Sequence, residues 1–239
     1  MKKLLPAFLA GILTTFAFAP AGLWWLAPLT FALLFSLLLE TTPKRAFLTG
    51  WLFGAGLLCT GLVWIENSMS VYAGMPRALA ITLAMLLALG LSLYYGLAAW
   101  LAVRFTRERQ KAARLIALAV LLVVMEWVRG WFLTGFPWLT IGYTQIDSWL
   151  AGYAPLGGVL LLSLLVTLTA SALAGLIRMR SLSATMPALA ILVVWSGGYL
   201  LQERTWTSPD GEARTVSLLQ GNIPQDQKWL PEMLLPTLD

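Results

Sequence analysis

Long apolar stretches alternate with short polar or basic segments along most of this chain. An α-helix rises about 1.5 Å per residue, so roughly 20 apolar residues cross the roughly 30 Å hydrocarbon layer of a bilayer. The pattern therefore predicts an all-α, polytopic membrane helix bundle with about seven transmembrane helices. The predicted spans are Leu4–Ala19, Leu23–Leu39, Ala46–Trp64, Ala78–Val103, Leu115–Val128, Leu156–Ile177 and Thr185–Leu201.

The composition supports a membrane protein and narrows the possible chemistry. Of 239 residues, 59% are hydrophobic and 11% are charged, whereas a soluble domain has about 45–50% apolar and about 25% charged residues. The chain has no His and one Cys, which excludes a Ser-His-Asp triad, a His-ligated metal and an internal disulfide from these residues. These counts also exclude an imidazole proton relay and a Cys-rich metal site, so no metal and no cofactor are expected here.

The basic residues indicate the orientation of the bundle. Eleven Lys and Arg lie in one set of alternate segments, two (Arg77 and Arg129) lie in the short loops of the other set, and three follow the last span. Because short cytoplasmic loops retain Lys and Arg, the N-terminus is expected inside and the tail outside. The net charge of +5 is concentrated in loops such as Arg104–Arg114. This distribution indicates contact with anionic lipid headgroups, and it argues against nucleic-acid binding.

The composition changes near Gln202, where a polar tail begins. We expect residues 1–201 to form the membrane bundle and residues 202–239 to begin an extramembrane domain. Within the tail, Thr215–Gln220 alternates like a β-strand and lies between turn-forming residues. A single strand needs partner strands, so the pattern predicts the first strand of an incomplete domain.

The segment Glu126–Trp149 is apolar and aromatic, but Gly and Pro interrupt it too often for a regular span. It fits either an interfacial anchor or a gate or wall that binds lipid. Glu126 and Arg129 lie three residues apart and can pair on one helical face. Their pairing is either a structural contact or part of a functional site, and the sequence leaves both open. Cys59, among glycines in an apolar span, is expected to have a packing role.

Two motifs give the chain a family resemblance. Glu126–Gln145 (EWVRGWFLTGFPWLTIGYTQ) together with Val216–Trp229 (VSLLQGNIPQDQKW) resembles the apolipoprotein N-acyltransferases of Gram-negative bacteria. Further matches in the same order are Phe16–Pro20, Gly74–Pro76 and Leu91–Tyr94. The resemblance implies a multi-span bundle in the bacterial inner membrane, followed by a periplasmic carbon–nitrogen hydrolase (nitrilase-like) α/β domain. It also implies acyl transfer from a phospholipid to the amine of a diacylglyceryl-cysteine lipoprotein, through a Cys thioester with a Glu base and a Lys that stabilises the oxyanion.

The resemblance assigns binding residues but no catalytic ones. In the family, the Glu, Lys and Cys lie beyond the first strand of the hydrolase domain, which here would be Val216–Gly221, and the chain stops at Asp239. The chain alone is therefore predicted to be inactive. Trp138 and Trp229 match family residues on the lipid side and at the active-site entrance, so both are predicted to bind substrate. The expected partners are a phospholipid acyl donor, a diacylglyceryl lipoprotein acceptor and membrane lipids.

Two other classes remain as alternatives. A transporter-like bundle would carry out no chemistry, but the near absence of charges within the spans argues against it. A non-catalytic truncated homologue that binds lipid or a partner has the same sequence features as the membrane half of an active enzyme.

Overall fold

The computed structural model describes residues 3–178, 185–224, 227–228 and 230, and every regular element within these ranges is a helix. The α-helices are α1 Leu4–Thr15, α2 Leu26–Leu38, α3 Pro43–Gly61, α4 Trp64–Asn67, α5 Arg77–Leu91, α6 Leu93–Phe105, α7 Lys111–Arg129, α8 Ala154–Arg178 and α9 Thr185–Gln202. The π-helix η1 is Ser68–Tyr72, and the 3-10 helices are η2 Phe132–Thr134, η3 Ile141–Gln145 and η4 Trp149–Tyr153.

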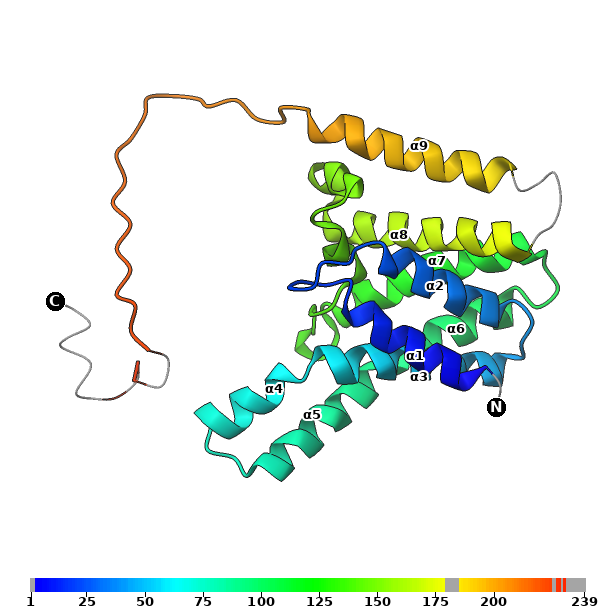
Figure 1. Cartoon of the computed structure of the whole chain (residues 1–239), viewed down its shortest axis with the longest axis horizontal. Coiled ribbons are helices and arrows are strands. Elements are labelled where there is room, and N and C mark those ends of the chain that lie inside the picture. Colours follow the sequence, from blue (N-terminus) through cyan, green and yellow to red (C-terminus); the bar gives the residue numbers. More distant parts are fainter. Residues whose placement is uncertain (1–2, 179–184, 225–226, 229, 231–239) are drawn as a thin grey trace.

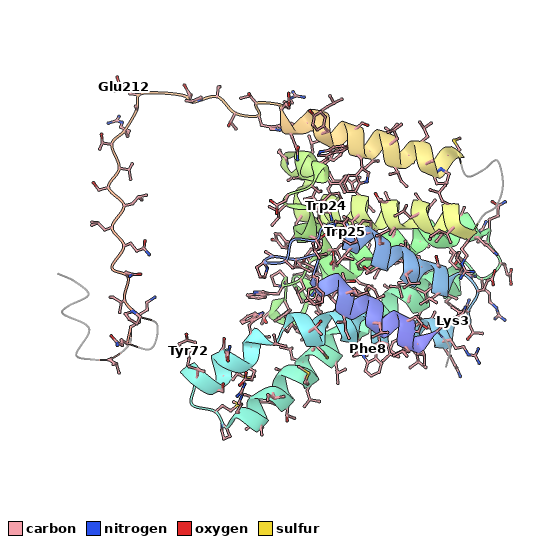
Figure 2. All side chains as sticks on the ribbon, viewed as in Figure 1. Lys3, Phe8, Trp24, Trp25, Tyr72 and Glu212 are labelled. Atoms are coloured by element: carbon pink, nitrogen blue, oxygen red, sulfur yellow. The ribbon has the colours of Figure 1, made fainter. Side chains whose placement is uncertain are left out.

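The helices form a bundle with α3 near its centre. Helix α3 packs against α1 and against α6, α6 packs against α7, and α8 packs against both α2 and α7. Phe31 and Phe35 of α2 and Phe53 of α3 are fully buried, and the rings of Phe31 and Phe53 lie 4.8 Å apart. The N-terminus and the C-terminal end of α9 lie at opposite ends of the bundle (Figure 1). Lys3 marks the N-terminal end (Figure 2).

Small residues bring the central helices close together. Gly11 of α1 and Gly56 of α3 each lie directly against backbone atoms of the other helix. Next to this contact, the hydroxyls of Thr15 and Thr60 are 2.6 Å apart. Such small-residue contacts allow helices to approach closely where lipid gives no hydrophobic driving force. Cys59, on the same helix as Gly56, is half-buried and packs against the core, as a packing role requires.

The helices only partly match the seven predicted spans. Two segments of the described chain, Arg77–Phe105 and Trp149–Arg178, are long and apolar enough to cross a membrane. Pro43–Gly61 with Trp64–Tyr72 adds a third if this pair, bent by 46°, counts as one span. Helices α1, α2 and α9 are apolar but shorter. Helix α7 has 19 residues and includes two Lys or Arg in its first half and a Glu and an Arg near its end, so it is less apolar.

The first span is shorter than predicted. We predicted a helix over Leu4–Ala19, but α1 ends at Thr15. The chain then turns, with the backbone N–H of Leu23 donating to the carbonyl of Phe16 at 3.0 Å. The next residue after the predicted span is Pro20, which has no N–H to continue a helix. The sequence pattern counted apolar residues of this turn as part of the span.

The predicted β-strand at Thr215–Gln220 is not confirmed. These residues belong to the described part of the chain, and they form neither a helix nor a strand. Leu218 and Leu219 are 92% and 97% exposed, so no other described segment packs against them. A strand is stable only when neighbouring strands pair with its backbone, and none of the described residues supplies such a partner.

The basic residues at the N-terminal end hold the C-terminus of α2. The Lys3 ammonium donates to the carbonyls of Leu37 at 3.1 Å and Glu40 at 2.9 Å. The Arg114 guanidinium donates to the carbonyl of Leu39, and Lys111 bonds the Glu40 carboxylate at 2.7 Å. The last carbonyls of a helix lack partners within the helix, and cations stabilise this negative end. Some of the basic residues that were predicted to contact lipid headgroups therefore also stabilise the C-terminal end of α2.

Candidate lipid-binding site at the end of α7

The segment that follows α7 forms an irregular cap on the bundle. It contains three short 3-10 helices, and Leu133, Thr134 and Leu139 have positive φ angles of 51°, 73° and 58°. Non-Gly residues rarely adopt this left-handed conformation, so the surrounding contacts must fix it. The segment lies toward the end of the bundle opposite the N-terminus (Figure 1). The sequence correctly predicted that Gly and Pro interrupt the helix here.

Glu126 and Arg129 hold this segment from the interior. Their side chains are 3% and 1% exposed. Arg129 Nη1 donates to the carbonyl of Trp138 at 2.7 Å, and the backbone N–H of Ile141 donates to Glu126 Oε1 at 2.8 Å. Arg129 Nη2 is 3.8 Å from Glu126 Oε1. The pair therefore fixes two backbone positions of the segment, which supports the structural role that the sequence left open.

Two buried polar atoms near this contact, Arg129 Nη2 and the hydroxyl of Tyr95 on α6, have no hydrogen-bond partner among the described residues. A buried polar group without a partner costs about 1–3 kcal/mol. A guanidinium N–H suits a phosphate or ester oxygen, so a ligand oxygen that reached Arg129 would remove this cost.

An apolar groove of about 860 Å³ lies beside Arg129. Helices α5 and α6, the end of α7 and residues 132–136 form its walls. Arg129 is the single charged side chain among the described residues that line it. Gly90 lines the groove and faces open space, because an added Cβ there would meet nothing within 4 Å. The volume lies in the range of small-molecule sites, and the apolar walls suit a hydrocarbon chain.

The structure places one of the two predicted binding residues beside this region. Trp138 is 50% exposed, and its ring lies 5.0 Å from that of Phe136 and 6.0 Å from that of Trp64. Phe136 also lines the groove. Trp138 is thus held at its carbonyl by Arg129 and at its ring by aromatic contacts. Trp229 lies outside the described residues.

Sequence reasoning missed several parts of the site. The hydroxyl of Ser163 on α8 accepts a hydrogen bond from the backbone N–H of Gly142 at 2.8 Å, which ties the segment to α8. Tyr95 and Gly90 come from helices far from the aromatic segment in the sequence. No local pattern links these residues, because only the tertiary packing brings them together.

The family comparisons cover most of the chain. Residues 10–172 match the family model described as "Apolipoprotein N-acyltransferase N-terminal domain". A curated protein of Chromobacterium violaceum named apolipoprotein N-acyltransferase is 46% identical over 232 residues, 97% of this chain and 45% of that protein. Proteins of the same name from Vibrio parahaemolyticus and Azotobacter vinelandii are 41% and 44% identical, covering 100% and 95% of this chain and 47% and 45% of their own length.

These matches extend through the bundle and the segment that caps it. The chain spans about half the length of the curated relatives it matches. It belongs to the apolipoprotein N-acyltransferase family and corresponds to the N-terminal, membrane part of these enzymes.

Proposed function

We propose that this chain forms the membrane part of an enzyme that transfers an acyl chain from a phospholipid to the amine of a diacylglyceryl lipoprotein. The observation that carries the proposal is the apolar groove beside Arg129, a buried cation with one N–H group that has no partner among the described residues. The groove holds the donor's acyl chain, and Arg129 bonds an oxygen of its ester or phosphate. The relatives' name supplies the reaction class.

A membrane bundle contributes to such a reaction by positioning. Donor and acceptor are both anchored in the lipid, and both diffuse laterally. Fixing the donor's ester at one end of the bundle replaces a bimolecular search by a bound geometry, which lowers the barrier by several kcal/mol in favourable cases. The chain itself is assigned no catalytic residue. As the family resemblance implies, the thioester-forming Cys, its Glu base and the Lys would lie in the part of the relatives that this chain does not cover.

The finer topology is part of the same proposal. The chain crosses the inner membrane seven times. Helices α1, α2, α7, α8 and α9 each form one crossing, α3 and α4 together form one, and α5 and α6 together form one. The N-terminus is cytoplasmic and the tail is periplasmic, as the basic residues favour. The opposite positions of the N-terminus and the end of α9 are consistent with an odd number of crossings (Figure 1). Residues 1–201 form the bundle, and residues 202–239 begin the periplasmic part.

Filling the groove tests the binding of the acyl chain. Gly90→Phe places a large ring in the open space beside Gly90 without meeting another atom of the protein at its Cβ. We expect donors with long acyl chains to show a KM raised about tenfold, equivalent to roughly 1.4 kcal/mol of lost binding. Transfer is measured in a chimera of residues 1–239 with the remaining part of the Chromobacterium violaceum relative. Gly90→Ala is the control, and an unchanged KM for Gly90→Phe would exclude the groove as the donor site.

Trp138 is the proposed contact on the lipid side of the site. Trp138→Ala removes its ring contacts with Phe136 and Trp64, and we expect acyl transfer by the same chimera to fall about tenfold, because aromatic contacts contribute about 0.5–1.5 kcal/mol beyond burial. Trp149→Ala is the matched control, since Trp149 has a similar exposure of 53% but packs against Tyr199 on α9. Equal loss in both variants would argue against a specific role for Trp138. Trp229 is proposed at the entrance on the resemblance alone.

A further inference from the structure

A second apolar groove lies at the other end of the bundle. It has a volume of about 500 Å³ and is formed by α7, α8 and α9. It is separate from the groove beside Arg129, and the two share no lining residue. Its walls are almost entirely apolar, and they include Ala112, Ile116, Leu168, Gly175, Ala190 and Ile191.

Among the described residues, the side-chain and glycine contacts that join α9 to the rest of the bundle lie in its C-terminal half. At the C-terminal end of α9, Gln202 Nε2 donates to the carbonyl of Ser148 at 2.8 Å. The backbones of Gly198 and Gly152 also meet there. In the other half, Met186 and Ala190 line the groove and are exposed. This half of α9 therefore faces α7 and α8 across an open apolar space.

The groove closes at Val194, and its length along α9 is close to the thickness of one bilayer leaflet. The indole N–H of Trp195 donates to the hydroxyl of Thr169 at 3.2 Å, which joins α9 to α8 beside the lining residue Val194. From Met186 to Val194 the helix rises about 12 Å. One leaflet contributes about 15 Å of the roughly 30 Å hydrocarbon layer. The groove thus matches the depth to which one acyl chain extends.

The open end of the groove lies beside an excess of positive charge. Ala112 and Gly175, which line the groove, lie within one helical turn of Lys111 and Arg178, and both cations are exposed. The hydrogen bond from Lys111, with the positive charges of Lys111, Arg178 and Lys3, holds the pKa of the Glu40 carboxyl below its usual range. Lys111, Arg178 and Lys3 therefore all lie close enough to the Glu40 carboxylate to act on it, so the charge beside the open end is positive.

We propose that this groove binds one acyl chain of an anionic phospholipid from the leaflet on the N-terminal side of the bundle, with the lipid phosphate at Lys111 and Arg178. Apolar walls below a basic rim complement both parts of such a lipid, and basic pockets between transmembrane helices commonly bind anionic headgroups. The bound chain fills the space between α9 and its neighbours and packs against the half of α9 that lines the groove.

Photocrosslinking in nanodiscs tests the acyl-chain part of the proposal. The probe is phosphatidylglycerol with a diazirine on its acyl chain, in bilayers of phosphatidylethanolamine that hold the 239-residue chain. We expect crosslinks on the groove side of α9 and on α8, at Ile191 and Leu168. Ala190→Trp fills the groove and lowers the yield at Leu168 about tenfold. The same substitution at Ala188, which is exposed but does not line the groove, leaves the yield unchanged.

Headgroup selectivity tests the basic rim. With a phosphatidylcholine probe, or in the Lys111→Gln/Arg178→Gln variant, crosslinking at Leu168 falls several-fold relative to phosphatidylglycerol. Equal labelling of all faces of α9 would overturn the proposal. So would equal labelling by both probes with no effect of the double variant. None of these readouts measures acyl transfer, so the result is independent of the proposed enzymatic function.

Discussion

Replacing Arg129 with methionine lowers the free energy of unfolding by about 3–5 kcal/mol, because it leaves the Glu126 carboxylate buried without its countercharge. It also removes the hydrogen bond from Arg129 Nη1 to the carbonyl of Trp138. The segment after α7 then loses one of the two backbone positions that the pair fixes. The change is measured by unfolding in detergent micelles, followed by tryptophan fluorescence.

Two further variants distinguish the loss of stability caused by breaking the buried pair from that caused by removing any positive charge. Arg107→Met removes an exposed cation from the α6–α7 loop, and we expect a change of no more than about 0.5 kcal/mol. The double variant Glu126→Leu/Arg129→Met removes both buried charges, so it is expected to lose less stability than Arg129→Met alone. An equal effect of Arg129→Met and Arg107→Met would contradict the assigned role of the pair.

Gly56→Val is the second large effect that we expect, with a loss of about 3 kcal/mol, at the upper end of overpacking costs. A Cβ at Gly56 would collide with the carbonyl oxygen of Phe8 and the amide nitrogen of Ile12 on α1. These are backbone atoms, so no side-chain rotation relieves the contact. Helix α1 must move away from α3, which separates one of the closest helix pairs in the bundle.

The control for this variant is the same substitution at an open glycine. Gly90→Val adds an identical side chain to α5, where an added Cβ meets nothing within 4 Å. Replacing this helical Gly costs little and adds some helix propensity. Unfolding midpoints of both variants are compared in the same detergent. Similar midpoints would mean that α1 and α3 do not touch at Gly56.

Sequence reasoning predicted the features that depend on residue type and spacing. The interrupted segment after α7 follows from its Gly and Pro residues, and the pairing of Glu126 with Arg129 follows from their three-residue spacing. The partners of this pair were not predictable, because the carbonyl of Trp138 and the N–H of Ile141 are backbone groups. Every residue offers such groups, so only the path of the folded chain selects them.

Long-range packing explains the other differences. Lys111 and Arg114 were expected to contact lipid headgroups, and no sequence pattern indicated that both also contact the end of α2, more than 70 positions away. Likewise, the groove beside Arg129 depends on how α5, α6 and α7 pack, which the hydrophobic pattern does not specify. The strand predicted at Thr215–Gln220 had suitable alternation, but strand formation also requires partners that the described chain lacks.

The most direct test of the central claim is acyl transfer from labelled phosphatidylethanolamine to a diacylglyceryl-cysteine peptide in reconstituted membranes. Two proteins are compared, residues 1–239 alone and their chimera with the remaining part of the Chromobacterium violaceum relative. We predict transfer by the chimera and none by the 239 residues alone, because we propose that the chain supplies the lipid-binding bundle and that the catalytic residues lie in the part of the relatives that it does not cover. Transfer by the 239 residues alone, or a folded chimera without activity, would contradict this account.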